Sequence, residues 1–251
     1  MDEWLQADAR TGRKPMSVPR GIRNLGGAAV ACLALTGAQP VVAVDQRGPV
    51  VVELYQSQGC SDCPPAQEYL NRLADRPGVL ALSFAVTYWD QLGWKDSFAS
   101  PRFTQRQRDY AAHNGGAGVA TPQFWINGRE TILGANIPRV ETAIAKAALA
   151  GPRIAAAGNH VTIAAGHAPA AADVWVVRYD PRTIAVAISA GENGGRTIPH
   201  RDIVRELVQI GHWNGAAEML TLPQPVTGGL ATAILLQDGK GGRIIAAALA
   251  R

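Results

Sequence analysis

Cysteine is scarce in this chain, with three residues in 251: Cys32, Cys60 and Cys63. A disulfide between Cys60 and Cys63 would close too small a loop to stabilise a fold by much. The pair therefore argues against a purely structural bridge. The length and a hydrophobic content of 47% are sufficient for a sizeable core and for one or two domains.

Neither sign of charge predominates in this chain. Its 24 basic and 20 acidic residues leave a formal net charge of +4. This excess is too small and too scattered to indicate a nucleic acid partner. The sequence has no glycine-rich phosphate loop and no serine-triad motif, and we expect no organic cofactor. No histidine lies at short ligand spacing from the cysteines, so we predict no metal site.

Near the N-terminus, the apolar stretch at residues 25–38 is too short for an ordinary membrane span. It follows two arginines and precedes small residues at 41–43, a pattern that predicts a secretory signal. We interpret residues 1–43 as an upstream extension and signal peptide, starting at Met1 or at Met16. The mature protein is then expected to be periplasmic or secreted, without stable membrane insertion. An uncleaved anchor or a disordered arm is the alternative.

The first regular pattern after this segment predicts a strand, a helix and a strand. An apolar β-branched run covers residues 49–55, a helical stripe covers residues 66–73, and a continuous apolar run covers residues 79–86. Two prolines before the stripe suit the first turn of a helix. This order predicts a βαβ unit with a parallel strand pair.

The chain then departs from a minimal α/β unit. An aromatic and acidic cluster at 88–96 precedes a polar helix that we expect from about Ser100. Asn127-Gly128 separates two short strand patterns and is a strong hairpin signal. A closing helix follows Ile137-Pro138 and ends at Gly151-Pro152, which we interpret as a domain boundary.

Residues beyond this boundary contain no long helix pattern. Short strand candidates recur there between glycine-rich turns, and their spacing favours a small antiparallel sandwich or barrel. These candidates are residues 161–164, 174–179, 184–189, 204–211, 218–222, 230–237 and 243–248.

Two motifs carry a resemblance to a known superfamily. A Cys60-x-x-Cys63 pair at the start of a helix, followed by Thr121-Pro122 before a hairpin, resembles the thioredoxin superfamily. We therefore predict an α/β fold with a thioredoxin-like domain at residues 44–151. A small antiparallel β domain, sandwich-like, is expected at residues 152–251.

A closer resemblance is to a bacterial family of secreted thioredoxin-like proteins of unassigned function. Four segments carry it: the stretch around the cysteines at 57–66, the aromatic segment at 88–94, Thr-Pro-Gln at 121–123, and Gly-Glu-Asn-Gly-Gly-Arg-Thr at 191–197. This resemblance spans most of the mature chain. It brings no settled activity with it.

The superfamily resemblance implies a role for each site residue. Cys60 is the candidate nucleophile and Cys63 the resolving thiol. Pro122 would be a cis-proline beside them, against the alternative of an ordinary trans bond, and the backbone of Thr121 would pair with bound peptide. Glu53 lies one residue from the usual position of a buried acid that handles the proton of the resolving cysteine. Its alternative is an edge-strand glutamate facing water.

The aromatic cluster and the residues between the cysteines refine this interpretation. Trp89 and Trp94 are predicted to wall a substrate groove, with core packing as the alternative. Asp62 predicts a weaker oxidant, because a carboxylate there opposes formation of the Cys60 thiolate.

These observations together predict a secreted thiol–disulfide oxidoreductase that acts on protein disulfides through its Cys-x-x-Cys pair. Its partners would be protein thiols and disulfides, and the redox direction stays open. The alternative is a non-catalytic thioredoxin-fold protein that binds a partner or delivers a metal, with a passive disulfide.

Overall fold

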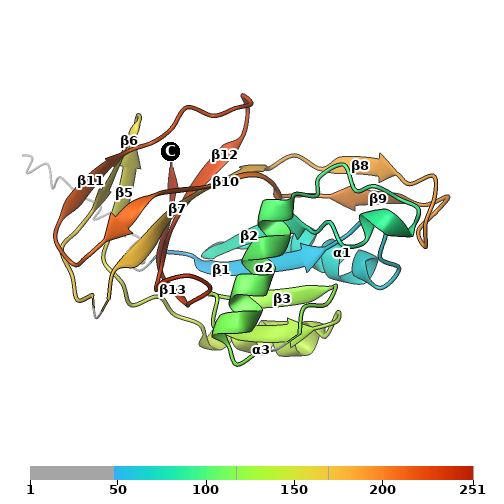
Figure 1. Ribbon diagram of the computed structural model, residues 1–251, viewed down its shortest axis with the longest axis horizontal. Helices are drawn as coiled ribbons and strands as arrows, with labels where there is room; N and C mark the ends of the chain where they lie inside the picture. Colours follow the sequence, from blue (N-terminus) through green and yellow to red (C-terminus); the bar gives the residue numbers. More distant parts are fainter. Residues whose placement is uncertain (1–47, 117, 169, 251) are drawn as a thin grey trace, which may run out of the picture. The chain divides into compact units, whose positions relative to one another are not determined.

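The computed structural model describes residues 48–116, 118–168 and 170–250 (Figure 1). The predicted extension and signal peptide at 1–43 lie outside these ranges. The described part is a mixed α/β structure, mostly strands, with one large mixed sheet. None of its helices is both long and apolar enough to span a membrane.

The predicted βαβ unit is confirmed. Its elements are β1 (Val50–Gln56), α1 (Cys63–Leu73) and β2 (Val79–Ala85). β1 and β2 are parallel neighbours over their whole lengths. The apolar stripe of α1 packs on one face of this strand pair, against Val52 and Leu54 of β1. Leu70 in the stripe is consequently only 1% exposed.

The predicted hairpin is also confirmed. It joins β3 (Gln123–Ile126) to β4 (Glu130–Leu133), and α3 (Ile137–Lys146) follows it and packs on the same face as α1. Asn127 and Gly128 both have positive φ, as a tight hairpin turn requires. Asn127 Oδ1 also accepts from the N–H of Val51 at 2.8 Å, which fixes the turn against β1.

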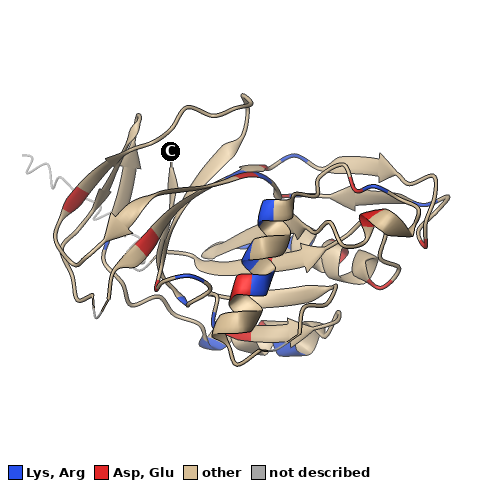
Figure 2. Cartoon of the chain, in the orientation of Figure 1, with Lys and Arg blue, Asp and Glu red and all other residues tan. Residues whose placement is uncertain are grey.

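α2 (Pro101–His113) covers the opposite face of the sheet, after the short 3₁₀ helix η1 (Asp90–Leu92) (Figure 1). Ser100 caps α2, accepting a hydrogen bond from the N–H of Arg102. Charged residues of both signs lie along this helix, and elsewhere both signs are spread over many elements (Figure 2). Phe103 and Tyr110 pack from α2 against the apolar face formed by β1 and β2.

The large sheet continues into the C-terminal half of the chain. Its strand order is β13-β12-β7-β10-β2-β1-β3-β4. The C-terminal strands of this sheet are β7 (Ala172–Asp180), β10 (Ile203–Trp213), β12 (Ala231–Gln237) and β13 (Ile244–Ala250).

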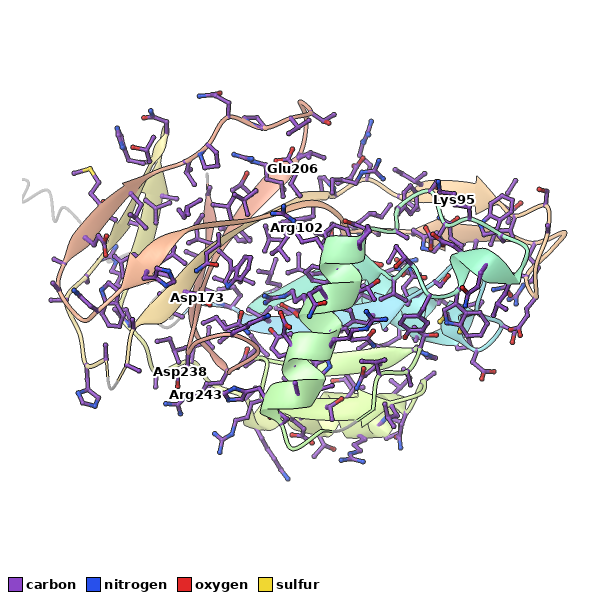
Figure 3. The ribbon with its side chains drawn as sticks, viewed as in Figure 1. Lys95, Arg102, Asp173, Glu206, Asp238 and Arg243 are labelled. Carbon is purple, nitrogen blue, oxygen red and sulfur yellow. The ribbon has the colours of Figure 1, made fainter. Side chains whose placement is uncertain are left out.

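This continuity corrects the domain boundary expected at 151/152. Ile203 of β10 pairs with Ser83 of β2, and the N–H of Ser83 donates to the carbonyl of Asp202 at 2.9 Å. Arg102 of α2 donates to the carbonyl of Leu207 in β10 at 2.9 Å (Figure 3). Because one sheet and one apolar core cross the expected boundary, the described residues form a single compact unit.

The C-terminal half carries two further small sheets. A three-stranded sheet packs through a separate apolar cluster against β7 and β12, which gives the predicted sandwich-like layering in part. Its strands are β5 (Ile154–Ala157), β6 (His160–Ile163) and β11 (Glu218–Thr221). A two-stranded ribbon consists of β8 (Ile184–Ala187) and β9 (Thr197–His200). β5 and β9 were not among the predicted strands.

Candidate functional site

The two cysteines lie together at the N-terminus of α1. Cys63 is the first residue of the helix, and its thiol donates to Cys60 Sγ at a distance of 2.6 Å. Both thiols are free. The N–H of Cys60 donates to the carbonyl of Ser57, and the N–H of Cys63 donates to the carbonyl of Cys60, so a tight turn leads into the helix. Helix N-termini favour anions, and a thiolate is one.

The pair divides into a more acidic and a less acidic thiol. The pKa of Cys60 is lowered to about 7, chiefly by the hydrogen bond from the Cys63 thiol, and Thr121 and the backbone N–H groups of Asp62 and Cys63 lower it further. Burial raises the pKa of Cys63 well above its ordinary value, and the hydrogen bond to Cys60 raises it further. The first proton that the pair loses therefore comes from Cys60.

The expectation for Asp62 stays a prediction. Its carboxylate was expected to oppose the Cys60 thiolate, and the pKa of Cys60 is lowered by other groups, the Cys63 thiol first. Asp62 is exposed, so water and salt screen its charge, while its backbone N–H stabilises the sulfur directly.

The peptide bond between Thr121 and Pro122 is cis, as predicted. Cys60 Sγ lies 3.6 Å from the carbonyl oxygen of Thr121, so this bond lies beside the cysteine pair. Thr121 is held in turn by Trp89, whose indole Nε1 donates to Thr121 Oγ1 at 2.7 Å.

The second tryptophan supports the loop before the cysteines. Trp94 Nε1 donates to Gln58 Oε1 at 2.9 Å, and the carboxylate of Asp96 accepts from the N–H of Gln58 at 2.8 Å. Burial raises the pKa of Asp96 to about 6. Both tryptophans are half-buried, so each buttresses one part of the site. Their contact with a substrate stays a prediction.

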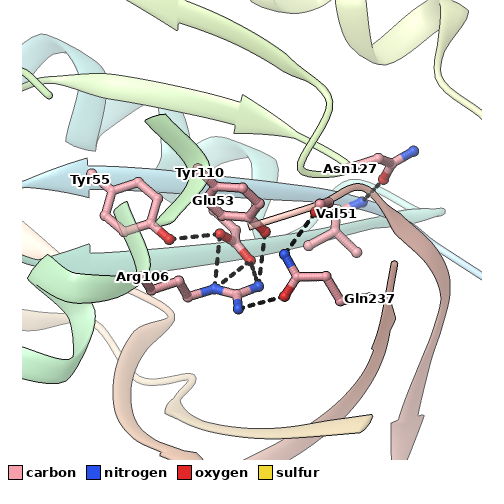
Figure 4. Close-up of polar contacts among 8 residues, drawn as sticks. Val51, Glu53, Tyr55, Arg106, Tyr110, Asn127 and Gln237 are labelled. Atoms are coloured by element: carbon pink, nitrogen blue, oxygen red, sulfur yellow. Dashed lines mark hydrogen bonds and ion pairs between the residues drawn. The ribbon is translucent and has the colours of Figure 1, made fainter. Parts of the chain in front are cut away.

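Glu53 lies in a buried polar network with Tyr55, Arg106 and Tyr110 (Figure 4). It is fully buried on β1, between β2 and β3, so the alternative of an edge glutamate facing water is wrong. Its carboxylate pairs with Arg106 Nη2 at 2.8 Å and accepts from the Tyr55 hydroxyl at 2.9 Å. Arg106 Nη1 also donates to Gln237 of β12. In the described part of the chain no hydrogen bond joins Glu53 to either cysteine.

Two residues near the cysteines were missed as site residues, although they lie in a segment that the resemblance included. Glu192 accepts from the N–H of Ser61 at 3.0 Å and from the Ser61 hydroxyl at 2.7 Å. Asn193 Nδ2 donates to the carbonyls of Cys60 and Gln58 at 2.7 and 2.9 Å. The sequence placed this segment beyond a domain boundary, so its contact with the cysteines could not be expected.

His200 is 1% exposed on β9 and lies beside Cys63. With Cys63 and Gln67 it lines a small internal void, and neither ring nitrogen has a hydrogen-bond partner among the described residues. Burial lowers the pKa of His200 to about 4, so the ring is neutral at physiological pH. Among the described residues, no group of three or more His, Cys, Asp or Glu side chains is placed to hold a metal ion.

The site is closed in this conformation. Cys60 is 1% exposed and Cys63 is 2% exposed. Attack on a protein disulfide requires contact between sulfur atoms. In this conformation the cysteine pair is therefore out of reach of a protein disulfide.

Comparison with known proteins gives a family and a recurring fold. Residues 51–237 match the protein family described as "Protein of unknown function (DUF1223)". No match is found among the curated proteins.

Two solved structures are similar to this chain. The crystal structure of protein AGR_C_4864 from Agrobacterium tumefaciens matches with a TM-score of 0.68 and 31% identity, covering 82% of this chain and 95% of that chain. HBP35 of Porphyromonas gingivalis matches with a TM-score of 0.56 and 13% identity, covering 81% of this chain and 74% of that chain. At that identity the second likeness shows the fold alone.

Proposed function

Since this chain belongs to the family of proteins of unknown function DUF1223, whose membership brings no activity, we propose from its own geometry that it is a thiol–disulfide oxidoreductase acting on protein disulfides. The observation that carries the proposal is the position of Cys60. Its sulfur lies at a helix N-terminus, 2.6 Å from a second thiol and 3.6 Å from the carbonyl that precedes a cis-proline.

The proposal includes a thioredoxin-like assignment for the first half of the chain. The order strand, helix, strand, helix, hairpin, helix, with a Cys-x-x-Cys pair and a cis Thr-Pro bond side by side, supports it. A periplasmic or secreted location is part of the same proposal, because disulfide exchange on proteins suits an oxidising compartment.

The reaction proceeds in two exchange steps. The Cys60 thiolate attacks one sulfur of a substrate disulfide, forms a mixed disulfide and expels the other sulfur as a thiolate. Cys63 then loses its proton and attacks Cys60 Sγ, which releases the second substrate thiolate. The substrate disulfide gains two electrons and the pair becomes a disulfide, so a dithiol donor must reduce it again. The reverse sequence oxidises a substrate dithiol.

The lowered pKa of Cys60 and the raised pKa of Cys63 support this division of roles. A thiol with a pKa of about 7 is about half ionised at neutral pH, and its thiolate is still a good nucleophile. The buried second thiol stays protonated until the mixed disulfide has removed the charge from Cys60.

The test is insulin disulfide reduction by the full chain carrying Cys32→Ser, so that only the pair contributes thiols. We expect turnover with a dithiol donor, loss of turnover in Cys60→Ser, and a trapped mixed disulfide in Cys63→Ser. Glu68→Gln, an exposed change on the same helix, is the control. Equal rates with and without Cys60 would refute the proposal.

A second candidate function is a non-catalytic binding protein with a passive cysteine pair. The exposure of only 1% at Cys60 favours it. A pair that equilibrates with glutathione only after unfolding would support this alternative, whereas fast equilibration in the folded protein supports the enzyme.

A further inference from the structure

The strands β8 and β9 form a two-stranded ribbon (Figure 1). Its tip, residues 188–196, contacts the cysteine turn through Asn193, which donates to the carbonyl of Cys60. In this tip, Glu192 accepts two hydrogen bonds from Ser61, and Asn193 donates to the carbonyls of Cys60 and Gln58. Asn193 is fully buried, and its Oδ1 accepts from Arg196 at 2.7 Å. The tip therefore holds the backbone on both sides of the nucleophile.

The tip also supports one wall of the site. A Cβ atom on Gly191 would lie 3.2 Å from the Cβ of Trp94, so the glycine allows the tip to lie directly on the aromatic segment. Trp94 in turn holds Gln58. Movement of the tip would release both the cysteine turn and the segment that packs beside it.

Three segments lie against the Cys60 turn: the aromatic segment, Thr121 and the tip. The aromatic segment leads directly into α2, and Thr121 precedes β3 of the large sheet. The tip belongs to a two-stranded ribbon that is separate from that sheet, and its bonds to Ser61 are at exposed positions. Exposed hydrogen bonds contribute little net stability. Its other bonds, from Asn193 to the carbonyls of Cys60 and Gln58, are buried, so water must replace them when the tip leaves. Of the three segments, the tip is the one whose departure leaves α2 and the large sheet in place.

We propose that the 188–196 tip is a latch that closes the dithiol site through Glu192 and Asn193, and that a protein disulfide reaches Cys60 only when this latch opens. The inference rests on the proposed function for its biological meaning, but not for its test. In the closed state Cys60 is 1% exposed. Opening breaks the bonds to Ser61, Gln58 and Cys60 and leaves the Cys63–Cys60 contact and the cis-proline in place.

The latch also explains why the chain retains a buried asparagine in a glycine-rich tip. The Asn193 amide donates to the carbonyl of Gln58. An apolar side chain at position 193 would leave this buried carbonyl without a hydrogen-bond partner. In the open state water can satisfy both groups. Opening therefore connects two states in which these polar groups are bonded, which keeps the free-energy difference between them small.

The experiment measures alkylation of the reduced full chain, carrying Cys32→Ser, by iodoacetamide at a fixed pH, with the labelled cysteine identified by mass spectrometry. With the tip unchanged, Cys60 should react at least about tenfold more slowly than an exposed thiol of the same pKa. A factor of about ten corresponds to the free energy of about one hydrogen bond that must break before the site opens. Glu192→Gln and Asn193→Ala should each accelerate labelling by several-fold to about tenfold.

Glu68→Gln is the matched control, because it makes the same change of charge on α1 without touching the tip. It should leave the labelling rate unchanged. Labelling must be confined to Cys60, since global unfolding would expose Cys63 equally. Asn193→Ala removes a buried polar group and could prevent folding. Glu192→Gln changes an exposed side chain, so it still tests the latch if Asn193→Ala does not fold. Rapid labelling of the unmodified tip, or labelling of both tip variants at the wild-type rate, would overturn the latch.

Insulin reduction by the same variants separates this inference from the proposed function. Faster alkylation together with faster insulin reduction supports both. Faster alkylation without any insulin reduction supports the latch and refutes the enzyme. Unchanged alkylation with Cys60-dependent insulin reduction refutes the latch and leaves the enzyme standing.

Discussion

Arg106 Nη2 lies 2.8 Å from Glu53 Oε1, in an interface between helix and sheet where neither side chain is more than 5% exposed. The same guanidinium donates to Gln237 and to the Tyr110 hydroxyl. One cation thus joins α2, β1 and β12. This arrangement explains how a carboxylate can lie in a central strand, since a lone buried charge would be strongly unfavourable.

Removing the Arg106 cation should strongly destabilise the folded protein. We expect Arg106→Met to lower the free energy of unfolding by about 3–5 kcal/mol, because the Glu53 carboxylate stays buried without a partner. Adding Glu53→Gln should restore part of the loss. Urea denaturation measures both. The control is Arg72→Met, which breaks an exposed pair with Glu68 and should change stability by less than about 1 kcal/mol. Similar small losses in both variants would contradict the buried-pair interpretation.

Cys63 should control the acidity of Cys60. Its thiol is the largest cause of the lowered pKa of Cys60, so Cys63→Ala should raise that pKa from about 7 by about one unit or more. Cys63→Ser keeps a hydrogen-bond donor and should raise it less. The ultraviolet absorbance of the thiolate, followed against pH, gives both values. A Cys60 pKa that stays near 7 in Cys63→Ala would assign the effect to the helix N-terminus instead.

His200 should make the folded protein sensitive to acid. Its pKa is lowered from 6.5 to about 4 by burial, so the unfolded chain binds the extra proton first as pH falls. The stability contribution is fully present above about pH 6.5 and is lost as pH falls toward 4, with a loss of up to about 3 kcal/mol at pH 4.

The difference between wild type and His200→Leu isolates this effect. Burial raises the pKa of Asp202 to about 7, and its contribution runs in the opposite direction, being lost as pH rises through 7. The wild-type curve alone would therefore be misleading. Denaturation at several pH values should show the stability of wild type falling relative to the variant below about pH 6.5. Parallel curves would mean that His200 is already protonated or is accessible to water.

Gly128 tests the tight packing under the hairpin. It has φ +61°, and a Cβ there would lie 2.7 Å from the Tyr110 ring and 2.9 Å from the carbonyl of Gly242. Gly128→Ala should lower stability by clearly more than the strain of about 1 kcal/mol expected for positive φ alone. Gly134→Ala is the control, since Gly134 has φ +70° with no atom within 4 Å of the added group. Equal losses in thermal unfolding would show that the contact with Tyr110 yields easily.

Local signals allowed much of this structure to be predicted. The βαβ unit, the Asn-Gly hairpin and the cysteine pair at a helix start depend on residues close together in the sequence. The cis bond of Pro122 was anticipated only through the resemblance. β9 was missed because Pro199 interrupts its short pattern, and β5 because Ile-Ala-Ala-Ala has little strand character.

The parts that could not be predicted depend on distant residues. Ser61 and Glu192 are 131 positions apart, as are Arg106 and Gln237. Neither spacing leaves a periodic trace in the sequence. The apparent domain boundary at 151/152 was misleading for the same reason, because a change in composition says nothing about strand pairing across it.

The junction between β2 and β10 makes the two halves of this chain inseparable in practice. If the chain stopped near residue 151, the N–H of Ser83 in β2 would lose its partner, the carbonyl of Asp202, and β10 would no longer cover this margin of the sheet, where strands of other molecules could then add. The fragment would also lose Gln237 from the buried charge cluster and Asn193 from the thiol turn. The first half of the chain therefore cannot keep the cysteine site intact by itself. Insertions or deletions in the C-terminal strands should change the geometry of the cysteine pair.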